Sequence, residues 1–435
     1  MLNYPEKVIK IAEIMKKHGY RAYAVGGCVR DSVMGRVPSD WDMTTDASPE
    51  KMIEIFDFEG IRTIPTGLKH GTVTVLLDGE SFELTTFRID GSYTDSRHPD
   101  GVTFTRNLQD DLARRDFTVN AMAADPLCQK ETDEFSGDIC ASNQATEDFS
   151  CSGENKEFSG INCAADKTAA EHLNHGRYDG KEIIDIYNGM DDIKNKIIRA
   201  VGEPERRFSE DALRILRAVR FTATLGFEIE EETKRAAKKL ANRLNKVSVE
   251  RKKVELEKML VSDGADRGVE LLFELGLEKY IHNELKKPKI SLTILPKRFE
   301  TRMAAMLFDN ENVPDLSGLK LSRVESSNIK KLCDKSKFCP ETSGKNARRM
   351  IYEYGDLAPD AAILHGYPEL AEIIKREAKN SPCVLIAQLN ISGTDLIESG
   401  IEPKKIGKIM EKLLFMVIDD PTLNSKEKLL ESALK

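Results

Sequence analysis

Hydrophobic positions divide the chain into a mixed first part and a helical second part. Up to about residue 127, a helical apolar spacing that ends near His18 is followed by short runs rich in β-branched residues. These runs predict strands at residues 21–25, 72–77, 82–88 and 102–105, since alternating apolar positions bounded by Gly turns favour half-buried strands. After residue 189, apolar positions recur at helical spacing and prolines separate the segments. The pattern predicts an α+β head, with a mixed sheet and helices, followed by an elongated all-α region.

The helical part begins with five expected helices. They are predicted at residues 190–198, 209–225, 230–244, 248–260 and 263–275. Ser209 is a suitable N-cap for the second of them, because its hydroxyl can accept a backbone N–H of the first turn.

Residues 128–177 interrupt this pattern with a polar, acidic segment. It carries a net charge of −6 out of −8 for the whole chain, and a short unit built around Phe-Ser is repeated in it. Such a composition predicts a poorly ordered insertion. Cysteines at 128, 140, 151 and 163 recur with this unit. Repetition explains their spacing more simply than a metal site does.

Composition excludes several classes of protein. The 435 residues are 40% hydrophobic and 32% charged, which excludes a disordered, collagen-like or disulfide-scaffold chain. The acidic balance disfavours general nucleic-acid binding, yet 65 Lys and Arg residues leave material for a basic face. We find no export signal, no apolar run long enough to span a membrane and no Cys-x-x-Cys pair. We therefore expect a cytoplasmic protein without a membrane partner.

The first candidate site combines a glycine turn with acidic residues. A predicted strand ends at Gly26-Gly27, and Arg30 follows on the first turn of the next helix. Two glycines let the backbone approach a phosphate closely, and the helix start offers N–H groups and a positive dipole end. Arg30 can bind the same anion. Asp40 and Asp42, two positions apart on a predicted strand, would place both carboxylates on one face, where hard oxygens suit Mg²⁺.

Each of these features alone is more often a turn or a solvated surface. Their order and spacing together resemble the signature of the DNA polymerase beta-like nucleotidyltransferase superfamily, and this resemblance implies nucleotidyl transfer served by two metal ions. Glu83 lies mid-strand, opposite in phase to its apolar neighbours. It is either an ordinary outward-facing residue or the third carboxylate that this superfamily usually supplies from such a strand.

A second candidate site follows on the helix predicted at 209–225. Its charged residues step by three along one flank: Asp211, Arg214, Arg217 and Arg220. A solvated charge ladder would look the same. However, a carboxylate beside a guanidinium presents an acceptor and a donor to a base edge, matching the amine and ring nitrogen of both cytosine and adenine. One such pair would select C and A over U and G.

Several longer motifs make a family resemblance specific. They are RRDFTVNAMA at 114–123, DIYNG at 185–189, IRAVG at 198–202 and EDALRILRAVRF at 210–221. With the first site, they closely resemble the class II (bacterial-type) tRNA nucleotidyltransferases, the CCA-adding enzymes of the poly(A) polymerase family. The resemblance is strong over 20–127 and 180–260 and weaker over 393–424. The insertion departs from the family, whose members usually have a short turn there.

This resemblance implies template-independent addition of the CCA terminus to tRNA, from CTP and ATP, with release of pyrophosphate. It implies Mg²⁺ held by Asp40 and Asp42, with Glu83 as a further catalytic candidate. The nucleotide-binding residues it implies are Gly27, Arg30, Arg115, Asp211, Arg214, Arg217 and Arg220. Asp211 and Arg214 would read the base, and the other arginines would chiefly contact phosphates.

The expected domains follow from these assignments. They are a catalytic head at 1–127 and 178–200, the acidic insertion at 128–177, a helical nucleotide-selecting neck at 201–270, a helical body at 271–335 and a tRNA-binding helical tail at 336–435. The sequence leaves the oligomeric state open, and an oligomer is compatible with it.

Three alternatives remain at this point. A bacterial poly(A) polymerase has a very similar head, but no Arg-rich C-terminal tail is present here. An enzyme that adds only A would look almost identical, whereas the linker 91–100 argues against one that adds only CC. A non-catalytic RNA-binding relative would be marked by loss of Asp40 or Asp42, and both are present.

Overall fold

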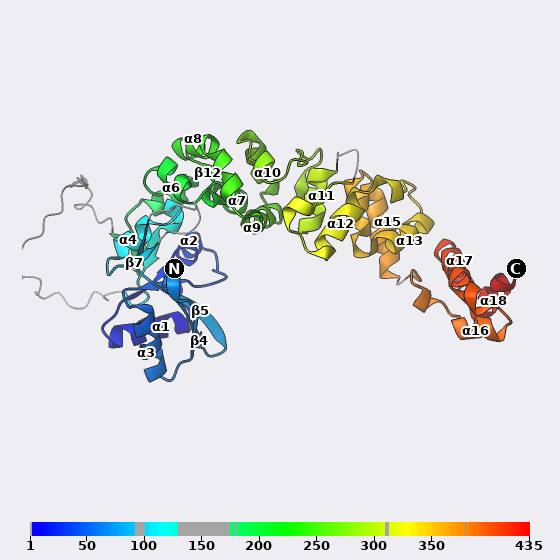
Figure 1. The fold of residues 1–435 in the computed structure, drawn as a ribbon, viewed down its shortest axis with the longest axis horizontal. Helices are drawn as coiled ribbons and strands as arrows, with labels where there is room; N and C mark the ends of the chain where they lie inside the picture. The colour runs from blue at the N-terminus through cyan, green and yellow to red at the C-terminus, as the bar shows by residue number, and fades with distance from the viewer. Residues whose placement is uncertain (1, 92–100, 129–174, 179–180, 309–312, 381) are drawn as a thin grey trace, which may run out of the picture. The chain divides into compact units, whose positions relative to one another are not determined.

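The computed structural model describes the chain except for residues 1, 92–100, 129–174, 179–180, 309–312 and 381 (Figure 1). The chain divides into two compact units, formed by the described parts of 1–203 and of 204–435. The predicted acidic insertion lies almost wholly outside the described residues.

The first unit is built on a mixed sheet of eight strands in the order β3-β4-β5-β2-β1-β8-β10-β9. In that order, the strands are Thr63–Gly67, Thr72–Leu77, Glu80–Thr86, Met43–Thr45, Ala22–Val25, Met122–Ala124, Lys181–Asp185 and His175–Tyr178. β2 and β5 run parallel and the other neighbours run antiparallel. The expected mixed sheet is therefore confirmed.

Helices and short strands complete this unit. The helices are α1 (Glu6–Lys17), α2 (Gly27–Val33), α3 (Pro49–Phe58), α4 (Leu108–Ala113) and α5 (Gly189–Asn195), and the short strands are β6 (Arg88–Asp90), β7 (Val102–Phe104) and β11 (Ile197–Ile198). One face of the sheet packs against α1 and α3 through a core that includes Ile11, Met43, Phe56 and Leu84. The strand predicted at 72–77 is confirmed, whereas the one predicted at 82–88 is interrupted at Phe87, between β5 and β6.

The second unit is helical from α6 to α18, apart from the two-residue strand β12 (Glu228–Ile229). Its helices are α6 (Pro204–Glu210), α7 (Leu213–Leu225), α8 (Glu231–Lys239), α9 (Val249–Leu260), α10 (Ala265–Glu274), α11 (Phe299–Leu307), α12 (Arg323–Cys333), α13 (Gly344–Tyr354), α14 (Ala358–Leu364), α15 (Pro368–Lys379), α16 (Gly393–Glu398), α17 (Ile406–Asp419) and α18 (Lys426–Leu434). Among the described residues, no helix is both long enough and apolar enough to cross a bilayer.

The prediction of a single helix at 209–225 is wrong. The structure has two helices there, and Ser209 lies inside α6 instead of capping a helix. Asp211 lies between them, and its Oδ1 accepts the backbone N–H of Leu213 at 3.0 Å. A short Asp side chain that bonds the backbone two residues ahead competes with the helix and starts a new one. The break places Asp211 at the start of α7.

Candidate active site

Asp40 and Asp42 lie directly before β2 instead of on it, because that strand begins at Met43. The carbonyl of Asp42 accepts the N–H of Val25 at 3.0 Å, which continues the pairing of β1 with β2 by one residue. The backbone of Asp42 is thereby fixed beside the end of β1, where the glycine turn begins. Asp42 thus lies near the turn, although the strand is shorter than predicted.

Glu83 is brought next to Asp42 by strand register. Met43 pairs with Leu84 across the parallel strands β2 and β5, so the residues that precede them, Asp42 and Glu83, are also neighbours. Met43 and Leu84 are buried, whereas Asp42 and Glu83 are exposed, as the alternation of side chains along a strand requires. Asp40 is exposed as well.

The electrostatics of Asp42 reflect this crowding. Partial desolvation raises its pKa, repulsion from Asp40 and Glu83 raises it further, and Arg115 opposes these effects. Carboxylate oxygens gathered in this way are the donor set that divalent cations prefer, so the residues fit a metal ion. Among the described residues, no three acidic, His or Cys side chains already stand as a metal-binding cluster. The carboxylates are therefore neighbours without forming a closed ligand shell.

The glycine turn brings the chain close to an arginine. Gly26 has φ +80°, and a Cβ built on it would lie 3.0 Å from Nη1 of Arg115. Gly27 is the first residue of α2. A residue with a side chain at position 26 would be strained by its backbone and would also press on Arg115. Gly26 therefore keeps the turn and the guanidinium in contact.

Arg30 is buried and tied to its surroundings. Its Nε donates to Asp31 at 2.9 Å and its Nη1 donates to Asn120. Asn120 in turn donates through Nδ2 to Asp116 at 3.1 Å. Arg30 thus links α2 to the Asp-Phe-Thr-Val-Asn motif, and this contact holds the glycine turn against the motif.

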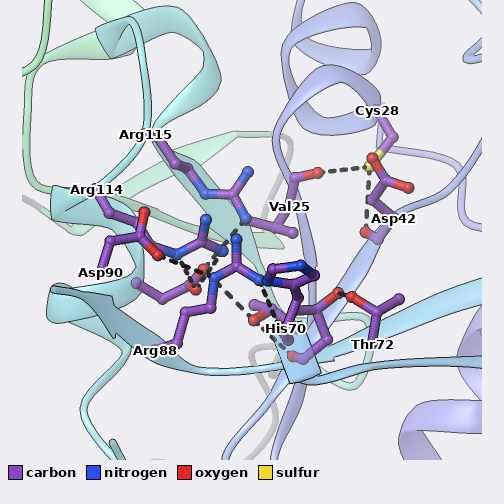
Figure 2. A network of polar contacts seen from close by, with 12 residues as sticks. Val25, Cys28, Asp42, His70, Thr72, Arg88, Asp90, Arg114 and Arg115 are labelled. Carbon is purple, nitrogen blue, oxygen red and sulfur yellow. Dashed lines mark hydrogen bonds and ion pairs between the residues drawn. The ribbon is translucent and has the colours of Figure 1, made fainter. Parts of the chain in front are cut away.

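Asp111 is a residue that sequence reasoning missed. It is fully buried and accepts hydrogen bonds from both arginines of the motif: Arg114 at 2.9 and 2.8 Å, and Arg115 at 3.2 Å. Burial alone would raise the pKa of Asp111, but the two guanidiniums lower it overall. Figure 2 shows the guanidinium of Arg115 directed toward Val25, at the end of β1. The spacing of three and four residues between Asp111 and the two arginines is the sequence signal that could have predicted these ion pairs.

The candidate base-reading residues belong to the second unit, and each has its own partner. Asp211 accepts a hydrogen bond from Arg251 of α9 at 2.6 Å. Arg214 is buried and donates to Glu210 at 2.8 Å and to the carbonyl of Arg207 at 3.0 Å. Asp211 and Arg214 are one helical turn apart, and hydrogen bonds to neighbouring residues hold both side chains in place.

Arg217 and Arg220 share one acidic partner. Their guanidiniums lie 3.7 and 3.1 Å from Glu255, which is also on α9. Arg220 additionally lies over the ring of Phe221, 4.1 Å from its centroid. Glu255 and Arg251 are four residues apart, so one face of α9 contacts Asp211, Arg217 and Arg220. Arg214 is instead held by α6. Neither Glu255 nor Arg251 was singled out from the sequence.

Comparison with known proteins agrees with this architecture. Two families match the chain: "Poly A polymerase head domain" over residues 22–141 and "Probable RNA and SrmB- binding site of polymerase A" over residues 226–287. A CCA-adding enzyme of Ligilactobacillus salivarius is 33% identical over 450 residues, which is 99% of this chain and 96% of that protein. The CCA-adding enzyme of Leuconostoc mesenteroides is 31% identical over 444 residues, 98% of this chain and 96% of that protein.

Solved structures give the same result. The Bacillus stearothermophilus CCA-adding enzyme in complex with CTP matches with a TM-score of 0.74 and 28% identity, covering 99% of this chain and 96% of that one. The Thermotoga maritima CCA-adding enzyme complexed with tRNA shares the fold, with a TM-score of 0.64 at 20% identity over 99% of this chain and 94% of that one. The head and the helical region together define a tRNA nucleotidyltransferase. The chain belongs to the CCA-adding enzyme family.

Proposed function

We propose that this enzyme adds C, C and A to the 3′ end of tRNA, from CTP and ATP, without a nucleic-acid template. The observation that carries the proposal is the closeness of Asp40 and Glu83 to Asp42, whose carbonyl accepts the N–H of Val25 next to the Gly26 turn. The likeness of this chain to CCA-adding enzymes extends over nearly its whole length, which favours addition of CCA to tRNA over synthesis of a poly(A) tail.

In the proposed reaction, the 3′-oxygen of tRNA attacks the α-phosphorus of the nucleotide. A new P–O bond forms there, the bond to the bridging oxygen breaks, and pyrophosphate leaves while the hydroxyl proton is lost to solvent. Asp40, Asp42 and Glu83 are the residues that would hold Mg²⁺, which supplies charge neutralisation at the phosphates when bound. Arg30, Arg115 and the backbone at Gly27 would bind the triphosphate.

Asp211 and Arg214 are proposed to select the base, and Arg217 and Arg220 to contact phosphates. A carboxylate has more lone pairs than its contacts with Leu213 and Arg251 use, so Asp211 can still accept from the amine of C or A. Because both side chains are already held by neighbours, little conformational freedom is lost on binding a base. This supports a fixed protein template.

The helical unit is the proposed partner of tRNA. An A-form stem has a deep major groove that side chains cannot read, so we expect contacts to its backbone and shape. We expect the enzyme to act in the cytoplasm, where free cysteines such as Cys28, Cys333 and Cys339 would stay reduced.

The test is a series of three tRNAs: one lacking CCA, one ending in CC and one complete. Each is incubated with a single labelled triphosphate. We expect C on the first, A on the second, and nothing on the third. Incorporation of A alone on the CC-ending tRNA would identify an A-adding enzyme, and continued A addition to the complete tRNA would identify a poly(A) polymerase.

A further inference from the structure

Asp111 on α4 is a buried carboxylate to which the proposed reaction gives no role. Its Oδ1 accepts from Arg114, and its Oδ2 accepts from Nη2 of Arg115 at 3.2 Å and from Oγ1 of Thr44 at 3.5 Å. Thr44 lies on β2, two residues after Asp42. Asp111 thus connects α4 to the strand that follows the metal-binding aspartates.

The guanidinium of Arg115 reaches the candidate site on its other side. Nη1 of Arg115 faces the Gly26 turn, and its charge acts on Asp42. Its Nε is buried, and within the described part of the chain it has no hydrogen-bond partner. Nη1 is therefore the guanidinium nitrogen that faces the turn which would receive the triphosphate.

Arg115 consequently lies between two sources of negative charge. On one side is Asp111, and on the other is Asp42, with Asp40 and Glu83 close to it. A guanidinium released by Asp111 would be attracted to this second group, where it would compete with a cation for the same oxygens.

We propose that Asp111 is a positioning residue that holds Arg115 at the Gly26 turn and away from the metal-binding carboxylates. Arg115 then stays available to the triphosphate, and the carboxylates stay available to the cation. This inference rests on the proposed function, since it assigns the triphosphate to that turn. It predicts that Asp111 affects nucleotide and cation binding together, for all four nucleotides alike, while base preference and tRNA binding stay unchanged.

The principal variant is Asp111→Asn, which keeps the shape and one acceptor but removes the charge. We would measure CTP binding to the full-length enzyme in EDTA, Mn²⁺ binding by electron paramagnetic resonance, and KM for CTP and for tRNA. We expect CTP affinity without metal to fall roughly tenfold, as for the loss of one charge-assisted contact. The half-saturating Mn²⁺ concentration should rise severalfold, and KM for tRNA should not change.

Arg114→Gln is the matched control. It removes the guanidinium whose Nε and Nη2 donate to Oδ1 of Asp111 at 2.9 and 2.8 Å, and it leaves the contact between Arg115 and Asp111 intact. We expect a loss of thermal stability similar to that of Asp111→Asn, but CTP affinity within about twofold of the wild type. Equal losses of CTP affinity in both variants would show that Asp111 acts through general stability and would overturn the inference.

A double variant tests whether Asp111 acts through Arg115. In an Arg115→Gln background, Asp111→Asn should lower CTP affinity no further. A second tenfold loss would contradict the inference, as would wild-type CTP and Mn²⁺ affinities in Asp111→Asn alone. If Asp111→Asn does not fold, Arg115→Lys replaces it, because an ammonium cannot bridge Asp111 and the turn. Wild-type CTP binding by Arg115→Lys would equally overturn the inference.

The measurements of CTP binding and Mn²⁺ binding contain no tRNA, so these two are independent of the proposed reaction. A wild-type enzyme that binds CTP but transfers no C to tRNA would contradict the proposed function and leave the role of Asp111 intact.

Discussion

Asp42 has charged residues of both signs around it: partial desolvation by burial raises its pKa, Asp40 and Glu83 raise it further, and Arg115 opposes them. We predict that Asp42→Ala and Asp40→Ala each abolish nucleotide incorporation and leave tRNA affinity within a few-fold of wild type, because these carboxylates would hold metal and not RNA. Incorporation of labelled C and a filter-binding titration with tRNA measure the two effects.

Asp46 provides the matched control for this prediction. Asp46 lies four residues after Asp42, and its carboxylate accepts a hydrogen bond from the backbone N–H of Arg21 at 2.8 Å. Asp46→Ala should retain near wild-type incorporation. Substantial turnover by both active-site variants would contradict the two-metal assignment.

A second prediction at this scale concerns the choice of base. Asp211→Ala removes the acceptor for the amines of C and A and also the group that repels O4 of U. A bidentate base contact is worth about 1 to 3 kcal/mol, so the ratio of CTP to UTP use should shrink by roughly one to two decades. Arg214→Ala should weaken both correct nucleotides. Single-turnover incorporation of each of the four triphosphates gives these ratios.

Arg217→Ala is the control for base choice, since a phosphate contact should weaken all four nucleotides without changing their order. If Asp211→Ala keeps wild-type selectivity, the base is read by other residues.

The candidate site residues were easier to single out from the sequence than the residues that contact them. Asp40, Asp42, Asp211 and Arg214 stand in local patterns that can be read along the sequence. Arg251 contacts Asp211 across 40 positions, and only the packing of α9 against α7 brings them together. Such pairings depend on tertiary contacts, which no local spacing encodes.

At the scale of elements, local hydrogen bonds decided where the prediction failed. Apolar periodicity continues through residues 209–225, so one helix was the natural interpretation. The carboxylate of Asp211 instead bonds the N–H of Leu213 and divides that stretch into α6 and α7. Periodicity reports which face is buried, and it does not report whether the backbone hydrogen bonds run without interruption. The strand at 72–77, by contrast, was predicted with correct ends because glycines or Asp-Gly bound it.

His365, at the end of α14, gives a pH prediction for the helical unit. Its ring stacks on that of Phe338, with 3.9 Å between the ring centroids, and meets the ring of Phe308 edge to face, with 4.7 Å between the centroids. Burial lowers the pKa of His365 to about 4. The folded state therefore favours the neutral ring. The contribution of neutral His365 to the free energy of unfolding should be fully present above pH 6.5. It should decline as the pH falls toward 4, because the histidine of the unfolded chain binds a proton at a higher pH than that of the folded chain.

Urea unfolding followed by circular dichroism at pH 7 and pH 5 measures this effect. His365→Phe keeps an aromatic ring but cannot titrate, so its unfolding free energy should depend less on pH than that of the wild type. An unchanged pH dependence in this variant would show that other groups account for it.

At the scale of the whole molecule, the acidic insertion interrupts the head between two strands of its sheet, β8 and β9. Ala124 of β8 and Gly176 of β9 both pair with Ile183 of β10, one on each side. Neighbouring strands lie about 4.8 Å apart, so the two flanking strands are only ~10 Å from each other. Both strands run antiparallel to β10 and so parallel to each other, and the loop that joins them has to cross β10 with roughly a dozen residues.

We therefore predict that replacing residues 130–172 by a short Gly-Ser linker preserves soluble protein, the thermal midpoint and CCA addition. A polar, acidic segment with few apolar residues contributes little to a core, and its removal leaves β9, which begins at His175, in place. A deletion extended through Tyr178 is the control: it removes β9, exposes the edge of β10 and should lower solubility and stability. Loss of soluble protein in the shorter deletion would show that the insertion is structural. Stoichiometric zinc in the full-length enzyme that disappears with the insertion would instead support a metal site at its cysteines.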